Sequence, residues 1–164
     1  MNAEQISGQV DLALGANQYL TFSLADEEYG VDILSVREIM GWGAATPIPN
    51  VPSYIKGVIN LRGTIIPIID LRERFNLEKQ PYGPTTVVVV LQVKGAKSQK
   101  TVGVVVDAVC DVYDIDAASL NPAPDFGGAF DTEFVRGLAT VSDKMIILLD
   151  IERLVEVGVL KAIT

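Results

Sequence analysis

The sequence predicts a mostly β protein, built from two small barrels of like design that pack side by side. The first observation is a strand-like alternation of apolar and polar side chains with a period of two, clearest over residues 19–24. The second is that helical periodicity is sparse. The third is an internal repeat, in which the same strand pattern occurs twice along the chain. A duplicated pattern of strands predicts two units of one design.

The strands follow one another with clear turn residues between them. After residues 19–24, the acidic residues 26–28 predict a turn, and residues 29–33 return as a second strand. The run 85–93 is apolar on both faces, which is typical of a strand inside a sheet rather than at its edge. Residues 102–106 follow as another strand after a polar turn.

Helical segments are predicted to be short. The best candidates are residues 71–75 and 151–155, with a further single turn at 117–120. Asp70 and Asp150 come directly before the first two segments. Because an aspartate side chain can accept a hydrogen bond from the first turn of a helix, both residues are predicted N-caps rather than catalytic acids.

The repeat aligns without gaps over two stretches. Residues 54–61 align on 134–141, and in the same register residues 65–71 align on 145–151. Each copy contains an aromatic residue, a basic residue, a glycine, a strand, a turn, an apolar strand, an aspartate and a short helix. Chance similarity between β-rich segments is the alternative explanation.

A weaker match precedes each copy, because residues 30–39 resemble residues 103–112. This register makes Val36 the counterpart of Val109, and Ile39 the counterpart of Val112. Two barrels of this kind leave a groove between them, with such residues on its walls. A groove with apolar walls can hold an amphipathic helix.

Composition excludes several classes of function. The 164 residues contain 13 Lys and Arg against 21 Asp and Glu, a net charge of −8, which argues against binding to nucleic acid. The chain has no histidine, so Ser-His-Asp and Cys-His sites are excluded, as is the commonest metal ligand. No apolar run approaches the roughly 20 residues needed to cross a bilayer. We therefore expect a cytoplasmic protein without membrane insertion.

Candidate chemistry is weak elsewhere. Residues 26–28 are read as a solvated acidic turn, and no cofactor, phosphate or metal site is predicted. Cys110 is the single cysteine, so it forms no internal disulfide. Because it lies in a strand-like segment without a basic neighbour, we expect a buried and inert thiol. Residues 1–17 are small and polar and are expected to be a flexible N-terminal segment.

A purely structural role explains Arg62 less well than it explains the other candidate residues. It lies at the predicted tip of a hairpin with apolar flanks, whereas Ser142 and Asp143 hold the matching positions of the second copy. A solvated turn arginine is one interpretation. The other is a binding role, because the guanidinium makes directional bonds and arginine is enriched in protein interfaces.

Four segments together resemble the CheW family of bacterial chemotaxis coupling proteins: residues 28–34, 55–63, 67–72 and 122–126. The similarity extends from about Tyr19 to Leu154. Its most specific part is the Asn-Leu-Arg-Gly hairpin that contains Arg62. The resemblance implies two five-stranded SH3-like barrels within a CheW-like domain at 18–156, followed by a short C-terminal tail at 157–164.

The resemblance also implies a function without catalysis. Members of the family bind the cytoplasmic hairpin tip of chemoreceptors and the regulatory domain of the histidine kinase CheA, at the receptor array beneath the inner membrane. By resemblance, one set of residues faces the receptor: Val36, Glu38, Ile39, Gly57, Arg62, Gly63, Val109 and Val112. Phe126 matches a position that faces the kinase.

Three other functions stay open. An enzyme would need a carboxylate or arginine site in the groove between the barrels. A small-molecule carrier would need a large cavity inside one barrel. A regulatory domain cut from a kinase would share the fold, although this chain has no histidine to phosphorylate.

Overall fold

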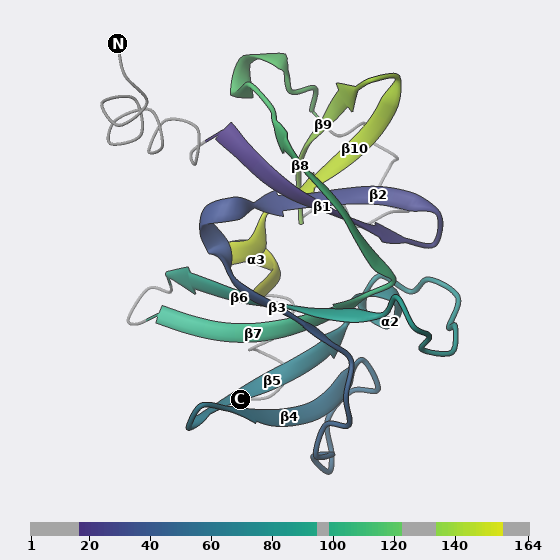
Figure 1. Cartoon of the computed structure of the whole chain (residues 1–164), viewed down its shortest axis with the longest axis vertical. Coiled ribbons are helices and arrows are strands. Elements are labelled where there is room, and N and C mark those ends of the chain that lie inside the picture. The colour runs from purple at the N-terminus through teal and green to yellow at the C-terminus, as the bar shows by residue number, and fades with distance from the viewer. Residues whose placement is uncertain (1–16, 95–98, 123–133, 156–164) are drawn as a thin grey trace.

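The computed structural model describes residues 17–94, 99–122 and 134–155, and it consists mainly of strands (Figure 1). Its strands are β1 (Gln18–Leu24), β2 (Glu27–Asp32), β3 (Val36–Gly41), β4 (Ile55–Leu61), β5 (Thr64–Asp70), β6 (Val87–Lys94), β7 (Gln99–Val106), β8 (Ala108–Asp114), β9 (Val135–Val141) and β10 (Lys144–Leu149). Its helices are the 3-10 turns η1 (Ile33–Ser35) and η2 (Ala117–Ser119) and the short α-helices α2 (Leu71–Arg74) and α3 (Ile151–Val155).

The predicted elements are confirmed with small changes at their ends. Asp70 caps α2 by accepting a hydrogen bond from the Glu73 N–H, and Asp150 does the same for Arg153 in α3. The second strand ends one residue earlier than predicted. There, Asp32 accepts a hydrogen bond of 2.9 Å from the Leu34 N–H, which starts the turn η1.

The strands form two five-stranded sheets with equivalent orders, β8-β1-β2-β10-β9 (sheet 1) and β3-β6-β7-β5-β4 (sheet 2). The repeat equates β1–β5 with β6–β10, in order. Each sheet therefore takes its first two strands from one copy and its last three from the other. The prediction of two like units is confirmed, but the units are not consecutive in sequence, because the chain crosses between the sheets after β2 and again after β7.

A pair of glycines shows how closely the two sheets correspond. Gly30 lies opposite Leu148 and Gly103 lies opposite Ile68, in parallel pairings that are equivalent by the repeat. A Cβ atom on either glycine would stand 2.7 Å from that partner's side chain. Any side chain at either place would have to displace the end of its partner's side chain, so glycine allows the two strands to pack closely there.

The largest hydrophobic core lies between the sheets rather than inside either one. This joint core takes Phe22 and Leu24 from sheet 1, Val89 and Leu91 from sheet 2, and apolar residues of both short helices. Smaller cores fill each sheet separately. The strand β6 contributes alternate residues to the joint core and to the core of sheet 2, which confirms the prediction that it is an interior strand.

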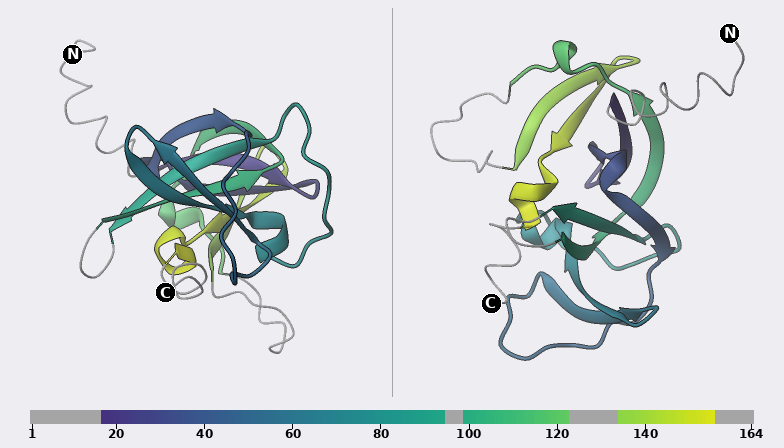
Figure 2. Two further views of the ribbon diagram at one scale, coloured as in Figure 1. Left: turned by 90° about the horizontal axis from the view of Figure 1, so that it is seen from below. Right: turned by 90° about the vertical axis from the view of Figure 1, so that its left-hand side faces the viewer.

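Neither sheet closes into a continuous barrel within the described residues. In sheet 2 an isolated bridge between Thr46 and Val58 joins the ends, and in sheet 1 the equivalent bridge joins Asn121 and Leu138. The sheets are SH3-like and strongly curved (Figure 2). The two ends of sheet 2 therefore meet at one bridge, between β4 and the chain that follows β3, and not along a ladder.

Two predicted segments and one predicted site residue lie mostly or wholly outside the described residues. They are the N-terminal segment 1–17, of which only Asn17 is described, the C-terminal tail 157–164, and Phe126 in the loop before β9.

Candidate docking surface

Arg62 lies at the tip of the β4–β5 hairpin, as the sequence predicts. Arg62 and Gly63 have φ angles of 50° and 89°, the left-handed values that a two-residue hairpin turn requires. The side chain of Asn60 accepts a hydrogen bond of 2.8 Å from the Gly63 N–H and fixes the turn. The Arg62 side chain is 73% exposed, so it contributes little to any core.

The structure joins Arg62 to Glu38, a second residue predicted for the same surface. The two guanidinium nitrogens Nη1 and Nη2 of Arg62 donate to the carboxylate oxygens of Glu38 over 3.2 and 2.9 Å. Glu38 is on β3 and Arg62 follows β4, so the pair links the two strands whose ladder is missing. A bidentate pair fixes the orientation of both side chains.

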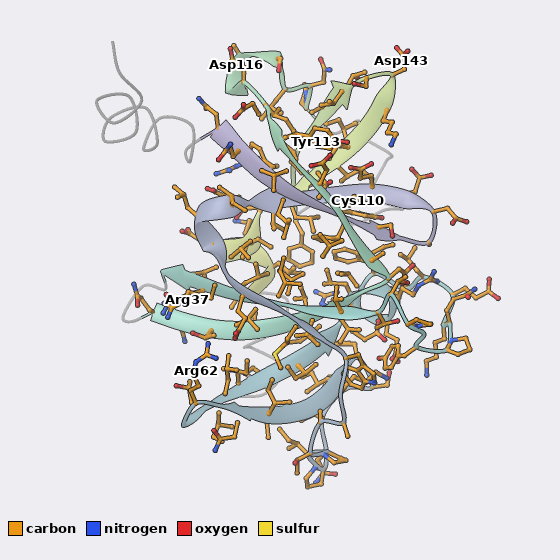
Figure 3. All side chains as sticks on the ribbon, in the orientation of Figure 1. Arg37, Arg62, Cys110, Tyr113, Asp116 and Asp143 are labelled. Atoms are coloured by element: carbon orange, nitrogen blue, oxygen red, sulfur yellow. The ribbon has the colours of Figure 1, made fainter. Side chains whose placement is uncertain are left out.

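Among the described residues, sheet 1 has no equivalent of this pair. The tip of the β9–β10 hairpin has the same left-handed backbone, with φ angles of 50° and 66°, but its residues are Ser142 and Asp143. The counterpart of Glu38 is Asp111, whose carboxylate accepts a hydrogen bond from the neighbouring Val112 N–H. Figure 3 shows Asp143 at the top of the molecule and Arg62 at the left of its lower half. The backbone of the turn is shared, and only one copy carries the cation.

The strands β3 and β8 occupy equivalent positions, which confirms the counterparts predicted from the repeat. Val36 lies opposite Leu91 and Val109 lies opposite Phe22, and each pairing has a register shift immediately beside it. Leu91 and Phe22 are themselves equivalent residues of the interior strands β6 and β1.

The two predicted walls lie on one face of the molecule (Figures 1 and 2). Val36 and Val109 are half-buried against the joint core. Ile39 and Val112 are each 43% exposed. The strands β3 and β8 therefore each expose one aliphatic side chain to solvent, and β3 also carries Glu38 of the ion pair with Arg62. The groove between the walls, and its occupation by a helix, stay predictions.

Comparison with known proteins assigns the family. The sequence model described as CheW-like domain matches residues 18–158. The chain belongs to the CheW family. A protein named chemotaxis protein CheW from Klebsiella aerogenes is 47% identical over 137 residues, covering 84% of this chain and 80% of that protein. Its namesake from Rhizobium meliloti is 37% identical, covering 86% and 88%.

A solved structure agrees with the fold. The scaffolding protein TtCheW from Thermoanaerobacter tengcongensis superposes with a TM-score of 0.76 at 40% identity, covering 87% of this chain and 89% of that one. CheW proteins are adaptors of chemotaxis. None of the helices in the described ranges is long and apolar enough to cross a membrane.

Gly57 is predicted to face the receptor, but the structure gives another reason for a glycine at this position. It is buried, with φ at 133°, and a Cβ atom there would stand 2.1 Å from the carbonyl oxygen of Thr46. Glycine is required because the strand carrying it touches the backbone beside the Thr46–Val58 bridge. Gly57 therefore supports the CheW fold under the surface, and direct contact with a partner stays a prediction.

The expectation that Cys110 is buried is wrong. It is exposed on β8, which lies at the edge of sheet 1 and, within the described residues, pairs with β1 alone (Figure 3). Its pKa is nevertheless raised, first by partial burial and then by the nearby Glu28 carboxylate, with Lys144 opposing both. A raised pKa favours the thiol over the thiolate, so the expectation of an unreactive cysteine agrees with these surroundings.

An ion pair that was not predicted from the sequence connects α2 to the turn between β7 and β8. Arg72 donates to both carboxylate oxygens of Asp107, Nε over 2.8 Å and Nη2 over 2.7 Å. Burial alone would raise the pKa of Asp107, but hydrogen bonds from Arg72 and from the Ala25 N–H outweigh it and lower that pKa. No sequence pattern indicates this pair, because the two residues lie on elements that only the fold brings together.

Proposed function

We propose that this CheW-family chain is a non-enzymatic adaptor that couples chemoreceptors to the histidine kinase CheA, in the cytoplasm at the receptor array. Family membership and the chemotaxis names of its relatives support the proposal. The observation that carries it is the exposed Glu38–Arg62 pair, a bidentate ion pair that joins β3 to the β4–β5 tip, on a molecule that also exposes Ile39 on β3 and Val112 on β8. Interfaces of proteins concentrate their binding energy in such combinations.

The proposed docking face comprises residues of β3, the β4–β5 tip and β8, namely Val36, Glu38, Ile39, Arg62, Gly63, Val109 and Val112. We place the helical hairpin tip of the receptor on it, since an amphipathic helix matches apolar residues flanked by charge. The regulatory domain of the kinase binds elsewhere, at the surface that includes Phe126. An adaptor of this kind needs no bound cofactor or metal ion.

The adaptor can couple the receptor to the kinase only if it binds the two signalling states of the receptor with different affinities. A receptor that changes shape alters kinase output only by the difference in its binding free energy between those states. The two sheets share one joint core, so we expect the adaptor to move as one rigid body. A rigid adaptor passes a change at the docking face directly to the kinase contact.

Reconstitution tests the proposal. Receptor, kinase and this protein are combined in membranes, and kinase phosphorylation is measured with each component omitted in turn. We expect attractant to control the kinase only when all three are present. Receptor control of the kinase in the absence of this protein would contradict the proposal, and turnover of a substrate by this protein alone would contradict its non-enzymatic part.

A matched pair of variants tests the docking face. Arg62→Ala removes the cation at one hairpin tip, and Ser142→Ala changes the equivalent position of the other tip. We expect Arg62→Ala to lower receptor affinity about 10-fold or more, the size typical of an interface arginine, and Ser142→Ala to leave it unchanged. Equal effects of both variants would mean that the tip acts only as a turn.

Two further variants separate the partners. Val36→Asp places a charge on the docking face and is expected to abolish receptor binding while sparing kinase binding, measured by co-sedimentation with each partner. Phe126→Ala is expected to have the opposite selectivity. Loss of both partners in either variant would show that receptor and kinase do not bind separate surfaces.

A further inference from the structure

The chain crosses from sheet 2 back to sheet 1 through a single residue, Asp107, which lies between β7 and β8. The strand β8 begins at the next residue and carries Val109 and Val112, one wall of the proposed docking face. The position of this wall against sheet 2 therefore depends on how the crossing at Asp107 is held.

Asp107 is held by segments of both sheets. On the side of sheet 1, the Ala25 N–H donates to its carboxylate over 3.0 Å, and its own N–H donates to the Ser23 carbonyl oxygen over 3.1 Å. On the side of sheet 2, Arg72 donates twice to the carboxylate, and the Thr85 hydroxyl donates to the backbone carbonyl oxygen over 2.9 Å. Polar contacts at Asp107 thus join the two sheets.

Arg72 is itself fixed in place. Its side chain is 13% exposed, and the third guanidinium nitrogen, Nη1, donates to the Glu78 carbonyl oxygen over 2.7 Å. All three nitrogens of a planar group therefore make directional hydrogen bonds. The helix α2 that carries Arg72 follows directly after β5, an interior strand of sheet 2. The Arg72–Asp107 pair, called the clamp below, thus attaches the start of β8 to the interior of sheet 2.

The equivalent crossing, from β2 to β3 through η1, is held differently. Leu34 takes the position of Asp107 and is 65% exposed. Glu152 takes the position of Arg72. The hydrogen bond that starts η1 is local, from the Leu34 N–H to Asp32. Among the described residues, the clamp is therefore present at the crossing that leads to β8 and absent at the crossing that leads to β3.

The clamp adds a direction that the joint core does not supply. Apolar packing attracts the two sheets to one another, but hydrophobic attraction has no preferred direction. A bidentate ion pair fixes the orientation of its two partners as well as their distance. The clamp therefore restricts how the start of β8 can rotate or slide against sheet 2.

We propose that Arg72 is a positioning residue for receptor binding, which acts through Asp107 to hold the β8 wall of the docking face in place. Arg72 acts in this way without touching the receptor. The inference rests on the proposed function, and it names a residue outside the docking face on which the receptor affinity depends. A surface that is already ordered binds more tightly, because association does not have to order it.

A double-mutant cycle tests the proposal. Arg72→Gln removes the cation, Asp107→Asn removes the anion, and the double variant completes the cycle. The matched control is Glu73→Gln on the same helix, which breaks an ion pair with Lys56 inside sheet 2. Binding of the full chain to a receptor cytoplasmic fragment and to the kinase regulatory domain is measured by calorimetry, well below the lowest melting temperature of the set.

We expect Arg72→Gln and Asp107→Asn each to bind the receptor fragment about 3-fold to 10-fold more weakly and to bind the kinase domain normally. The double variant should bind no more weakly than either single variant, because both changes remove the same contact. Glu73→Gln should bind both partners normally, even where it melts lower. Equal weakening by Glu73→Gln would mean that receptor affinity follows the stability of α2, and would overturn the proposal.

The exposed Cys110 on β8 gives a direct readout of the wall in the free protein. A spin label on Cys110 is combined with a second label at Thr64→Cys, an exposed position at the start of β5. We expect the distribution of distances between the labels to shift or broaden in Arg72→Gln and to stay unchanged in Glu73→Gln. An unchanged distribution in Arg72→Gln would overturn the positioning role even if receptor affinity falls.

The outcomes separate this inference from the proposed function. If the unchanged protein binds the receptor fragment and Arg72→Gln binds it equally well, the positioning role is wrong and the adaptor function stands. Additive losses in the double variant, or loss of kinase binding together with receptor binding, would also overturn the positioning role. If the unchanged protein binds no receptor fragment, both proposals fail.

Discussion

Sheet 1 and sheet 2 share strand order, register and closing bridges, but their charged contacts differ. In sheet 2 Lys56 forms an ion pair with Glu73, while the equivalent positions of sheet 1 hold Arg136 and Arg153, which have the same sign of charge. At the hairpin tips, Arg62 pairs with Glu38 in sheet 2 only. The polar contacts of one half therefore cannot form in the other.

The charged contacts also differ between the turn that joins β7 to β8 and its equivalent, the segment η1 that joins β2 to β3. Asp107 binds Arg72, whereas the counterpart of Asp107 is Leu34, which is 65% exposed, and the counterpart of Arg72 is Glu152. The backbone is alike in both halves, because Gly30 and Gly103 lie at equivalent parallel pairings where a neighbouring side chain approaches closely. Side chains at the surface carry no such constraint. Candidate sites are therefore best sought where equivalent positions differ.

The largest loss of stability is expected from a substitution in the joint core, which both sheets share. Phe22 is fully buried in the joint core and stacks on Tyr29. Phe22→Ala should reduce the free energy of unfolding by about 3–5 kcal/mol. The change is in sheet 1, but the fluorescence of Trp42, the single tryptophan, reports on sheet 2. In Phe22→Ala we expect the urea midpoint measured by Trp42 fluorescence to fall by the same amount as the midpoint measured by far-UV circular dichroism.

The control for that prediction is Met145→Ala, at a side chain 57% exposed on sheet 1. It should change the free energy of unfolding by less than about 0.5 kcal/mol. A normal Trp42 transition in Phe22→Ala, with an early transition by circular dichroism, would show that the sheets unfold independently.

The next largest loss of stability is expected at one of two equivalent glycines, Gly57 and Gly137. Gly57→Ala places a Cβ atom 2.1 Å from the Thr46 carbonyl oxygen at a positive φ, and should cost about 2–4 kcal/mol of stability. At Gly137 the equivalent distance to Asn121 is 3.1 Å, and φ lies outside the left-handed region. We expect Gly137→Ala to cost less than half as much by urea denaturation. Equal costs would contradict the asymmetry of the two bridges.

A smaller effect depends on pH. Asp107→Asn removes the charge that binds Arg72, and should cost about 1–2 kcal/mol at neutral pH, since both side chains are partly exposed. The pKa of Asp107 is lowered in the folded state, so the pair stabilises the protein fully above the ordinary value of 3.8 and progressively less as the pH falls below it.

Urea denaturation of both proteins at neutral pH, pH 5 and pH 3 checks this. The difference between Asp107→Asn and the unchanged protein should be constant between the first two and smaller at the third. A difference that grows on acidification would mean that another group controls the acid sensitivity.

The smallest effect on stability is expected at the docking face. Arg62→Ala breaks an ion pair whose cation is 73% exposed, and such pairs contribute less than about 1 kcal/mol. Thermal melting should be nearly unchanged, although receptor affinity falls. A loss of several kcal/mol would assign Arg62 to the fold and remove the support for a binding role.

The shape of the hairpin tips was predictable from the sequence because the repeat carries structural information: Ser142 and Asp143 adopt the same left-handed backbone as Arg62 and Gly63. The comparison of copies also showed that Arg62 has no equivalent cation, and its role in binding stays a prediction. The exposure of Cys110 was not predictable, because alternation along a strand does not tell whether a second layer covers its outer face.

The strands, the short helices with their aspartate caps and the duplication could be read from the amino-acid sequence, since they depend on neighbours along the chain or on the match between copies. That the copies exchange strands and share one core is visible only in the folded protein. Only the folded protein also shows that Glu38 reaches Arg62 and that Arg72 reaches Asp107. The physical reason is that these contacts depend on where the chain crosses between sheets, which no local pattern records.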